Sequence, residues 1–261
     1  MTESELLFSG LFNYSRDELY NNRNRRLSRR ECFSLADALS RRFKGEPLQY
    51  ILGKTEFMGL SFRITPDVFI PRPETEILVE AAIRAAKSES RKVRKILDIG
   101  TGSGCIAVSL AKFLPAPQIS AVDISQKALQ IAKQNALLNN VEINFLLADL
   151  FPLPELEALE YDLIVSNPAY IPTAEISSLQ EELSFEPRVA LDGGSDGLDF
   201  YRRIIEEAPA YIKQGGFLIM EMGHNQCSAI KDLFNSSGEF ELIEVVRDYN
   251  HIDRVVVTRL K

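Results

Sequence analysis

The chain has 261 residues, 45% of them hydrophobic and 26% charged, which is typical of a globular protein long enough to bury a substantial core. Its formal net charge of -7 argues against a protein that coats nucleic acid, and no apolar run is long enough to span a bilayer. The three cysteines lie far apart and only two histidines are present, which argues against a disulfide framework or a zinc site. Because the N-terminus also lacks the features of a signal peptide, we expect a cytoplasmic protein without a metal ion.

The first fifty residues have the pattern of helices. Ser28 and Glu31 fit a capping box, and apolar side chains follow them at helical spacing. These apolar residues are Cys32, Leu35, Ala36, Leu39 and Phe43. From Arg16 to Lys44, nine basic residues outnumber four acidic ones, a local charge of +5. This charge suits a docking surface for an acidic partner or, equally, a solvated helical surface.

A β-prone region follows the helices. Between residues 50 and 70, two short runs flank Met58 and Gly59, which predicts a hairpin. The prolines of the stretch 71–76 exclude a helix until about Thr75, after which the apolar spacing predicts an amphipathic helix.

From Lys95 onward, apolar strands and helices alternate. The predicted strands are 95–100, 118–125, 143–149, 161–167, 215–223, 240–250 and 253–261. Such alternation predicts an α/β fold with a mostly parallel sheet covered by helices on both faces. The last two strands are too close for a crossover helix, so we expect them to pair antiparallel. We divide the chain into a small N-terminal domain with the hairpin as linker, 1–70, and a larger domain, 71–261.

A glycine-rich turn joins the first predicted strand to a helix. The turn contains Gly100, Thr101, Gly102, Ser103 and Gly104. Its glycines permit a tight turn and let a ligand lie against the backbone, beside the positive end of the helix dipole. Asp123 ends the next strand, where its carboxylate can accept hydrogen bonds from both ribose hydroxyls. The combination predicts a site for a nucleoside-type ligand.

A third acidic position, Asp149, ends the third strand. Its carboxylate is a candidate to meet the amino group of an adenine, with Leu150 packing on the ring. The alternative is a loop carboxylate without a ligand.

This arrangement of strand, glycine turn, helix and Asp123 resembles the Rossmann-like S-adenosylmethionine-dependent methyltransferases. The resemblance implies S-adenosyl-L-methionine as the cofactor, with the glycines facing its methionine part and Asp123 its ribose. An NAD enzyme is the competing interpretation. The G-x-G-x-G spacing and the lack of a second mononucleotide half disfavour it.

The stretch SNPAYIP, residues 166–172, follows the fourth strand. Asn167 offers a side-chain carbonyl oxygen and Pro168 a backbone carbonyl, and two acceptors at one strand end match a planar NH2 group. An amide or aniline-like nitrogen is a poor nucleophile because its lone pair is delocalised, so alignment with a sulfonium methyl is what a site can supply. Tyr170 can lie over the flat substrate or near the cationic sulfur.

Asn-Pro-Pro-Tyr is the corresponding tetrapeptide of methyltransferases that act on planar amino groups. The whole chain resembles, almost end to end, the protein glutamine methyltransferases that modify peptide chain release factors. The matching stretches are GEPLQYILGKTEFMGLSF, VFIPRPETEILVE, LDIGTGSGCIAVSLA, SNPAYIP, EPRVALDGGSDGLDFYRRI and FLIMEMG. The resemblance implies methylation of the glutamine in the Gly-Gly-Gln motif of class I release factors. It also implies that the N-terminal domain helps to hold this protein substrate.

The resemblance also implies roles for the tetrapeptide. Asn167, Pro168, Ala169 and Tyr170 would contact the substrate, and Asn167 would border the cofactor as well. Ala169 departs from the family, which has a second proline there. Because a residue before proline is pushed out of the α region, Pro168 has lost a restraint on the angle that aims its carbonyl. We expect Ala169→Pro to preserve or improve turnover on a release factor.

Two other functions stay open from the residues alone. An adenine methyltransferase acting on DNA or RNA needs the same tetrapeptide chemistry. Residues 51–261 carry a charge of -9, the total of -7 less the +2 of residues 1–50, which is a poor surface for a phosphate backbone. A non-catalytic binding module is disfavoured by the intact glycines, Asp123 and Asn167. We therefore expect no direct contact with nucleic acid or with a membrane.

Overall fold

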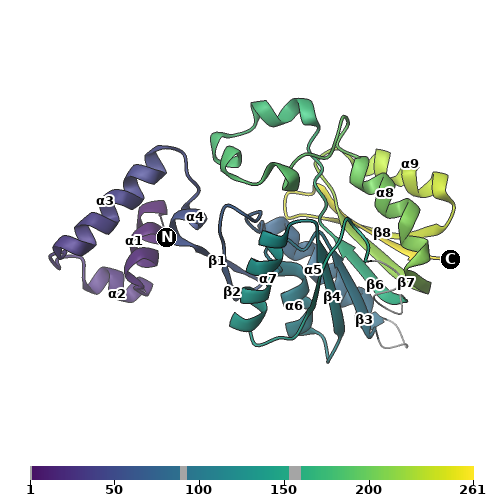
Figure 1. Ribbon diagram of the computed structural model, residues 1–261, viewed down its shortest axis with the longest axis horizontal. Helices are drawn as coiled ribbons and strands as arrows, with labels where there is room; N and C mark the ends of the chain where they lie inside the picture. The colour runs from purple at the N-terminus through teal and green to yellow at the C-terminus, as the bar shows by residue number, and fades with distance from the viewer. Residues whose placement is uncertain (1, 89–92, 153–159) are drawn as a thin grey trace.

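The computed structural model describes residues 2–88, 93–152 and 160–261. Its N-terminal part is a group of short helices (Figure 1). The helices are α1 (Glu3–Phe12), α2 (Arg16–Asn21), α3 (Arg29–Phe43) and α4 (Leu48–Leu52). Each of the first three begins at a capping box, with Thr2, Ser15 or Ser28 as the N-cap. The side chain of the cap and that of the Glu three residues later each bind a free backbone N–H, which fixes where the helix starts. The capping box predicted at Ser28 is confirmed.

Helix α3 buries few of the apolar residues whose spacing predicted it. Its one buried residue is Ala38, which packs with Leu7 and Ile51 in a small core of its own. Phe43 and Leu39 are 88% and 41% exposed. The spacing therefore predicted the helix correctly, but most of its apolar residues face away from the core.

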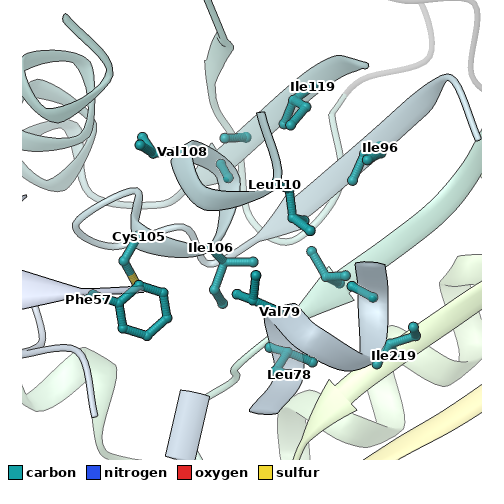
Figure 2. Close-up of a cluster of buried hydrophobic side chains, with 14 of the residues drawn as sticks. Phe57, Leu78, Val79, Ile96, Cys105, Ile106, Val108, Leu110, Ile119 and Ile219 are labelled. Carbon is teal, nitrogen blue, oxygen red and sulfur yellow. The ribbon is translucent and has the colours of Figure 1, made fainter. Parts of the chain in front are cut away.

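The predicted hairpin is formed by β1 (Lys54–Phe57) and β2 (Leu60–Arg63). Met58 and Gly59 have φ angles of 52° and 70°, the left-handed pair that a two-residue hairpin turn requires. Phe57 and Phe62 pack edge to face and join the large core beside helices α5 (Pro73–Ser88) and α6 (Cys105–Phe113). Figure 2 shows Phe57 next to Cys105. Packing thus favours grouping the hairpin with the larger domain, and the division at residue 70 stays a prediction.

Helix α5 spans Pro73–Ser88 and begins two residues before the expected start near Thr75. The expectation was wrong because proline is well tolerated in the first turn of a helix, where its missing N–H would have no partner. The earlier start places Thr75 inside the first turn.

A seven-stranded sheet forms the centre of the larger domain, in the order β5-β4-β3-β6-β7-β9-β8. Its strands are β3 (Lys95–Ile99), β4 (Gln118–Asp123), β5 (Asn144–Leu147), β6 (Tyr161–Ser166), β7 (Ile212–Glu221), β8 (Phe240–Arg247) and β9 (Asp253–Leu260). The first five run parallel, whereas β9 pairs antiparallel with both β7 and β8. The mostly parallel α/β sheet and the antiparallel end are confirmed.

Helices cover the two faces of this sheet (Figure 1). Besides α5, they are α6 (Cys105–Phe113), α7 (Gln126–Leu138), α8 (Asp199–Glu207) and α9 (Cys227–Ser237). Alternate strand residues point to opposite faces, so Ile96 packs with α5, α6 and α7 while Leu97 packs with α8 and α9. Figure 2 shows the first of these cores. No helix in the described ranges has the length and apolar composition that a membrane crossing needs.

The chain order reverses between β3 and β6. From β3 the chain continues to β4 and β5 on one side, and it then returns to β6 and β7 on the other. In open α/β sheets the carboxyl ends of the strands at such a reversal form a crevice that holds ligands. The predicted site residues follow the ends of β3, β4, β5 and β6, so the topology brings them to this edge.

Candidate active site

A cavity of about 830 Å³ opens at the carboxyl edge of the sheet. The predicted residues that line it are Gly100, Thr101, Gly102, Ser103, Asp123, Asp149, Leu150, Asn167, Pro168, Ala169 and Tyr170. Gly104 is the one predicted residue that does not. The cavity therefore joins the glycine turn and the tetrapeptide in a single space.

The glycine turn separates into a ligand-facing part and a packing part. Gly100 and Gly102 have φ angles of 69° and 54°, and a Cβ added to Gly100 would meet no atom within 4 Å. Gly104 has a φ of 82°, and its Cβ would lie 3.0 Å from the Cβ of Ala132 on α7. The first two glycines leave room for a ligand against the backbone, whereas Gly104 lets α6 and α7 approach closely.

Asp98, at the base of the turn, is a buried carboxyl group that the sequence did not single out. Its Oδ2 accepts hydrogen bonds from Thr101 Oγ1 at 2.6 Å and from the Ala107 N–H at 3.2 Å. Burial raises its pKa to about 7. Asp98 thus ties the turn to the first turn of helix α6.

Asp123 holds the other side of the turn. Its two carboxylate oxygens accept hydrogen bonds from the N–H groups of Gly102 and Ser125, each at 2.8 Å. Burial raises its pKa. Each oxygen keeps lone-pair capacity, so the carboxylate can still accept hydrogen bonds from the hydroxyls of a ribose.

Asp149 and Leu150 lie at the same edge with different environments. The Asp149 carboxylate pairs with both terminal nitrogens of Arg203 on α8, at 3.0 and 3.2 Å, and its side chain is 55% exposed. Leu150 is buried and has a φ of 71°. The contact of Asp149 with an adenine stays a proposal, because the carboxylate already has a cationic partner.

The tip of β6 is tied to β3. Ser166 stands opposite Ile99 in the parallel register, and its Oγ donates a hydrogen bond to the Ile99 carbonyl at 2.9 Å. Asn167 and Gly100, which follow these two residues, consequently lie side by side. This pairing sets the amide of the tetrapeptide next to the glycine turn.

The Asn167 side chain is held at its amide nitrogen by the first turn of α5. Nδ2 donates a hydrogen bond to Thr75 Oγ1 at 3.1 Å. None of the described residues donates a hydrogen bond to Oδ1, which leaves this oxygen available as an acceptor. Pro168 and Ala169 are buried beside it.

Tyr170 is half-buried in the cavity wall. Burial raises the pKa of its phenol to about 12, so the ring stays neutral at physiological pH. Its backbone carbonyl accepts a hydrogen bond from Gln226 Nε2 at 2.9 Å, which fixes the backbone that carries the ring.

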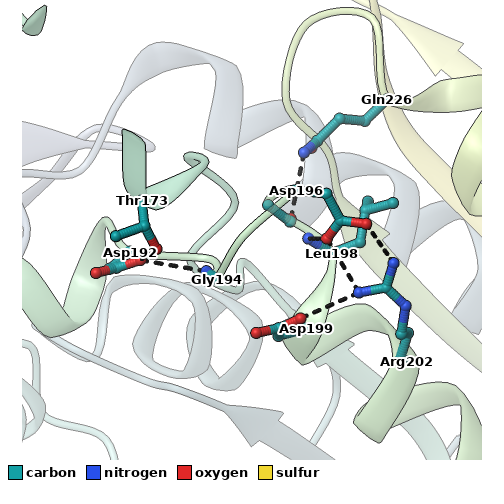
Figure 3. A network of polar contacts seen from close by, with 9 residues as sticks. Thr173, Asp192, Gly194, Asp196, Leu198, Asp199, Arg202 and Gln226 are labelled. Atoms are coloured by element: carbon teal, nitrogen blue, oxygen red, sulfur yellow. Dashed lines mark hydrogen bonds and ion pairs between the residues drawn. The ribbon is translucent and has the colours of Figure 1, made fainter. Parts of the chain in front are cut away.

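The segment 192–202 packs against the backbone of the tetrapeptide. Figure 3 shows its internal contacts, in which Arg202 meets Asp196 and Asp199. A Cβ on Gly193 would lie 2.8 Å from the Ala169 carbonyl oxygen, and one on Gly197 would lie 2.3 Å from that of Tyr170. The glycines therefore let this segment lie directly against the tetrapeptide backbone.

Sequence reasoning missed two buried glutamates, one that lines the cavity and one that pairs with the cavity residue Arg72. Glu221 ends β7, is 3% exposed and lines the cavity. The sequence signal that could have identified Glu221 was an acidic residue near the C-terminal end of the apolar run 217–222. Glu186 accepts a hydrogen bond from the Ile70 N–H at 3.1 Å and pairs with Arg72. Burial raises the pKa of Glu186 although Arg72 acts to lower it.

Several solved methyltransferase structures have the same fold. The hMettl16 catalytic domain in complex with a MAT2A 3'UTR hairpin matches with a TM-score of 0.60 and 16% identity, over 88% of this chain and 80% of that one. A methyltransferase from Pyrococcus furiosus matches with a TM-score of 0.56 and 14% identity, over 86% and 98%. At these identities the likeness establishes the methyltransferase fold alone.

Sequence comparison is far more specific. The family model "Methyltransferase small domain" matches residues 73–184, and "PrmC N-terminal domain" matches residues 1–53. The release factor glutamine methyltransferase of Geobacter sulfurreducens is 45% identical over 99% of this chain and 89% of its own. That of Thermodesulfovibrio yellowstonii is 40% identical over 98% and 91%. The chain therefore belongs to the release factor glutamine methyltransferase family.

Proposed function

We propose that this protein transfers a methyl group from S-adenosyl-L-methionine to the side-chain amide nitrogen of a glutamine in a peptide chain release factor. The target is the glutamine of the Gly-Gly-Gln motif of class I factors. The observation that carries the proposal is the single cavity in which Asn167 and Pro168 adjoin Gly100 and Gly102. This cavity sets acceptors for an NH2 group beside a turn with room for a methyl donor.

S-adenosyl-L-methionine is the methyl donor of this family, and it supplies a methyl group on a positively charged sulfur. The residues fit such a ligand. The open space over Gly100 accommodates a group that lies on the backbone, and Asp123 retains acceptor capacity for ribose hydroxyls. Thr101 and Ser103, both 3% exposed, complete the turn.

The acceptor half of the site acts by orientation. Asn167 Oδ1 and the Pro168 carbonyl are two acceptors for the two N–H groups of a carboxamide, which fixes the plane of the amide. Fixing both hydrogens points the nitrogen in one direction, and alignment of reacting atoms lowers barriers by up to roughly 7–11 kcal/mol in favourable cases. No strong base is needed in this scheme, because the nitrogen becomes acidic once it is alkylated.

The charge distribution supports a protein substrate over DNA or RNA. Residues 51–261, which include the whole cavity, carry a charge of -9, and a phosphate backbone binds through basic side chains. The basic N-terminal helices suit an acidic face of a release factor. Nothing in the described site favours an adenine substrate over a glutamine side chain. The proposal includes a cytoplasmic location, which the three unpaired thiols support.

Incubation with labelled methyl donor and either purified release factor or DNA tests this function. We expect label in the release factor, confined to the tryptic peptide that contains Gly-Gly-Gln. Label in DNA alone would refute the proposal and favour the adenine methyltransferase. Absence of donor binding in calorimetry would instead favour a non-catalytic protein.

A further inference from the structure

Thr75 and Glu221 stand behind Asn167 at the wall of the cavity. Thr75 belongs to the first turn of α5 and is 2% exposed, and Glu221 ends β7 and is 3% exposed. Both line the cavity, and the Glu221 carboxyl interacts with the side chains of Thr75 and Asn167. One oxygen of this carboxyl, Oε2, is buried with no hydrogen-bond partner in the described part of the chain. Three separate segments therefore place an acid, a hydroxyl and an amide in contact.

The order of donors and acceptors in this group determines which way the amide faces. Asn167 Nδ2 donates to Thr75 Oγ1 at 3.1 Å, so the Thr75 proton is available to the Glu221 carboxylate. An ionised carboxylate only accepts, and it therefore draws both the hydroxyl proton and the amide N–H groups toward itself. The amide oxygen of Asn167 is then the atom left for the cavity.

We propose that Thr75 and Glu221 are positioning residues that fix the Asn167 amide with its oxygen presented to the substrate NH2 group. The inference rests on the proposed glutamine methylation. A reversed amide would present its own NH2 to the NH2 of the substrate, and two donors cannot bond each other. The contacts among Glu221, Thr75 and Asn167 exclude the reversed orientation of the Asn167 amide before the substrate binds.

The charge state of Glu221 determines the direction of the hydrogen bonds that link Glu221, Thr75 and Asn167. A protonated Glu221 can donate to Thr75, which can then donate to the Asn167 oxygen and reverse the amide. Burial raises the pKa of Glu221 to about 7, a rise that Glu74 reinforces, while Thr75, Arg254 and Asn167 act to lower it. Tyr170, Tyr201 and Cys105 also face this charge. The oriented form is thus the form above about pH 7, and we expect turnover to rise with pH through this range.

Removal of the hydroxyl is the first test. Thr75→Val keeps the shape of the side chain and should lower kcat by roughly 10- to 100-fold, because the amide is no longer held in one orientation. KM for the release factor and calorimetric donor affinity should stay near wild type, since one amide is a small part of a protein–protein contact. Thr75→Ser should restore most of kcat.

A second buried threonine provides the matched control. Thr258 is fully buried on β9 and donates to the Leu218 carbonyl at 2.9 Å, away from the cavity lining. Thr258→Val loses a buried hydroxyl as Thr75→Val does, but it should keep wild-type kcat. Equal kcat in the two valine variants would overturn the proposal, and so would a loss of donor affinity in Thr75→Val as large as its loss of kcat.

Replacement of the acid is the second test, and one of its two readouts does not need activity. In Glu221→Gln the neutral amide accepts and donates, so the rise of kcat through about pH 7 should disappear. The Asn167 side-chain NH2 signal in NMR, identified by its absence in Asn167→Ala, should titrate in the wild type and stay constant in Glu221→Gln. A titration of this signal that persists in Glu221→Gln would overturn the proposal even if Thr75→Val does not fold.

The outcomes also separate this inference from the function on which it rests. A wild-type protein that does not methylate release factor would refute the function. A wild-type protein that methylates it, with valine variants at 75 and 258 that behave alike, would refute the positioning role only.

Discussion

Two buried carboxyl groups lie beside threonine hydroxyls, one at the base of the glycine turn and one in the wall of the cavity. Asp98 accepts from Thr101 in the glycine turn, and Glu221 interacts with Thr75 behind the tetrapeptide. Burial raises the pKa of each to about 7. Asp98 accepts hydrogen bonds from the turn and from the helix that follow it directly in the chain. Glu221 instead interacts with two side chains from other segments, Thr75 and Asn167. In the function and the positioning role that we propose, the same chemical pair builds the turn that holds the cofactor and orients the side chain that contacts the substrate.

Asn167→Ala should have the largest effect of all, a loss of methyl transfer at the substrate side of the site. Transfer to release factor should fall by more than ~100-fold, because the acceptor that positions the reacting nitrogen is lost. Donor affinity in calorimetry should stay largely intact, since Asp123 and the glycine turn are untouched. An equal loss of transfer and of donor affinity would contradict the assigned role.

Asp98→Ala should damage the cofactor end instead. It leaves the Thr101 hydroxyl and the Ala107 N–H without their acceptor, at a cost of about 1–3 kcal/mol for each unsatisfied group. We expect a lower free energy of unfolding and weaker donor binding, with kcat at saturating donor less affected than in Thr75→Val. Chemical denaturation and calorimetry measure the two effects. Unchanged donor affinity would show that the turn does not depend on Asp98.

The pH dependence of stability should report both carboxyl groups. Their pKa values in the folded state exceed the usual values of 3.8 and 4.5, so the folded protein binds more protons than the unfolded chain between these values and about 7. The free energy of unfolding should therefore fall as pH rises through this range, by up to about 1.4 kcal/mol per pH unit for each group.

Variants can show which carboxyl group causes the change of the free energy of unfolding with pH. Glu221→Gln and Asp98→Asn should each flatten the dependence when denaturation is repeated across the same pH range. A slope that is unchanged in both variants would mean that other groups cause it.

Ala169→Pro should have the smallest effect. The Ala169 N–H donates no hydrogen bond to any described residue, so proline removes none. Proline also restrains Pro168 and the unfolded chain, which should preserve or improve turnover and add about 0.4–1 kcal/mol to the free energy of unfolding. A large loss of turnover on release factor would show that the loop has a shape that proline cannot adopt.

Local patterns account for most of what the sequence predicted. The alternation after Lys95, the capping box at Ser28 and the hairpin turn at Met58 are all read from neighbouring residues, and each is confirmed. The start of α5 was placed too late because proline was treated as a helix breaker at a position where it is tolerated.

Contacts between distant segments account for most of what was missed. Glu221 looked like the end of an ordinary strand, because its partners Thr75 and Asn167 meet it only through the order of β6 and β7 and the docking of α5. Helix α3 shows the same limit, since its spacing predicts a helix but cannot tell that Phe43 faces outward.

The most direct test of the account is the position of the methyl group on a release factor treated with wild-type protein and with Asn167→Ala. Fragmentation mass spectrometry should place one methyl group on the side-chain amide nitrogen of the Gly-Gly-Gln glutamine with the wild type and none with the variant. A methyl group on another residue, or equal methylation of this glutamine by Asn167→Ala, would contradict it.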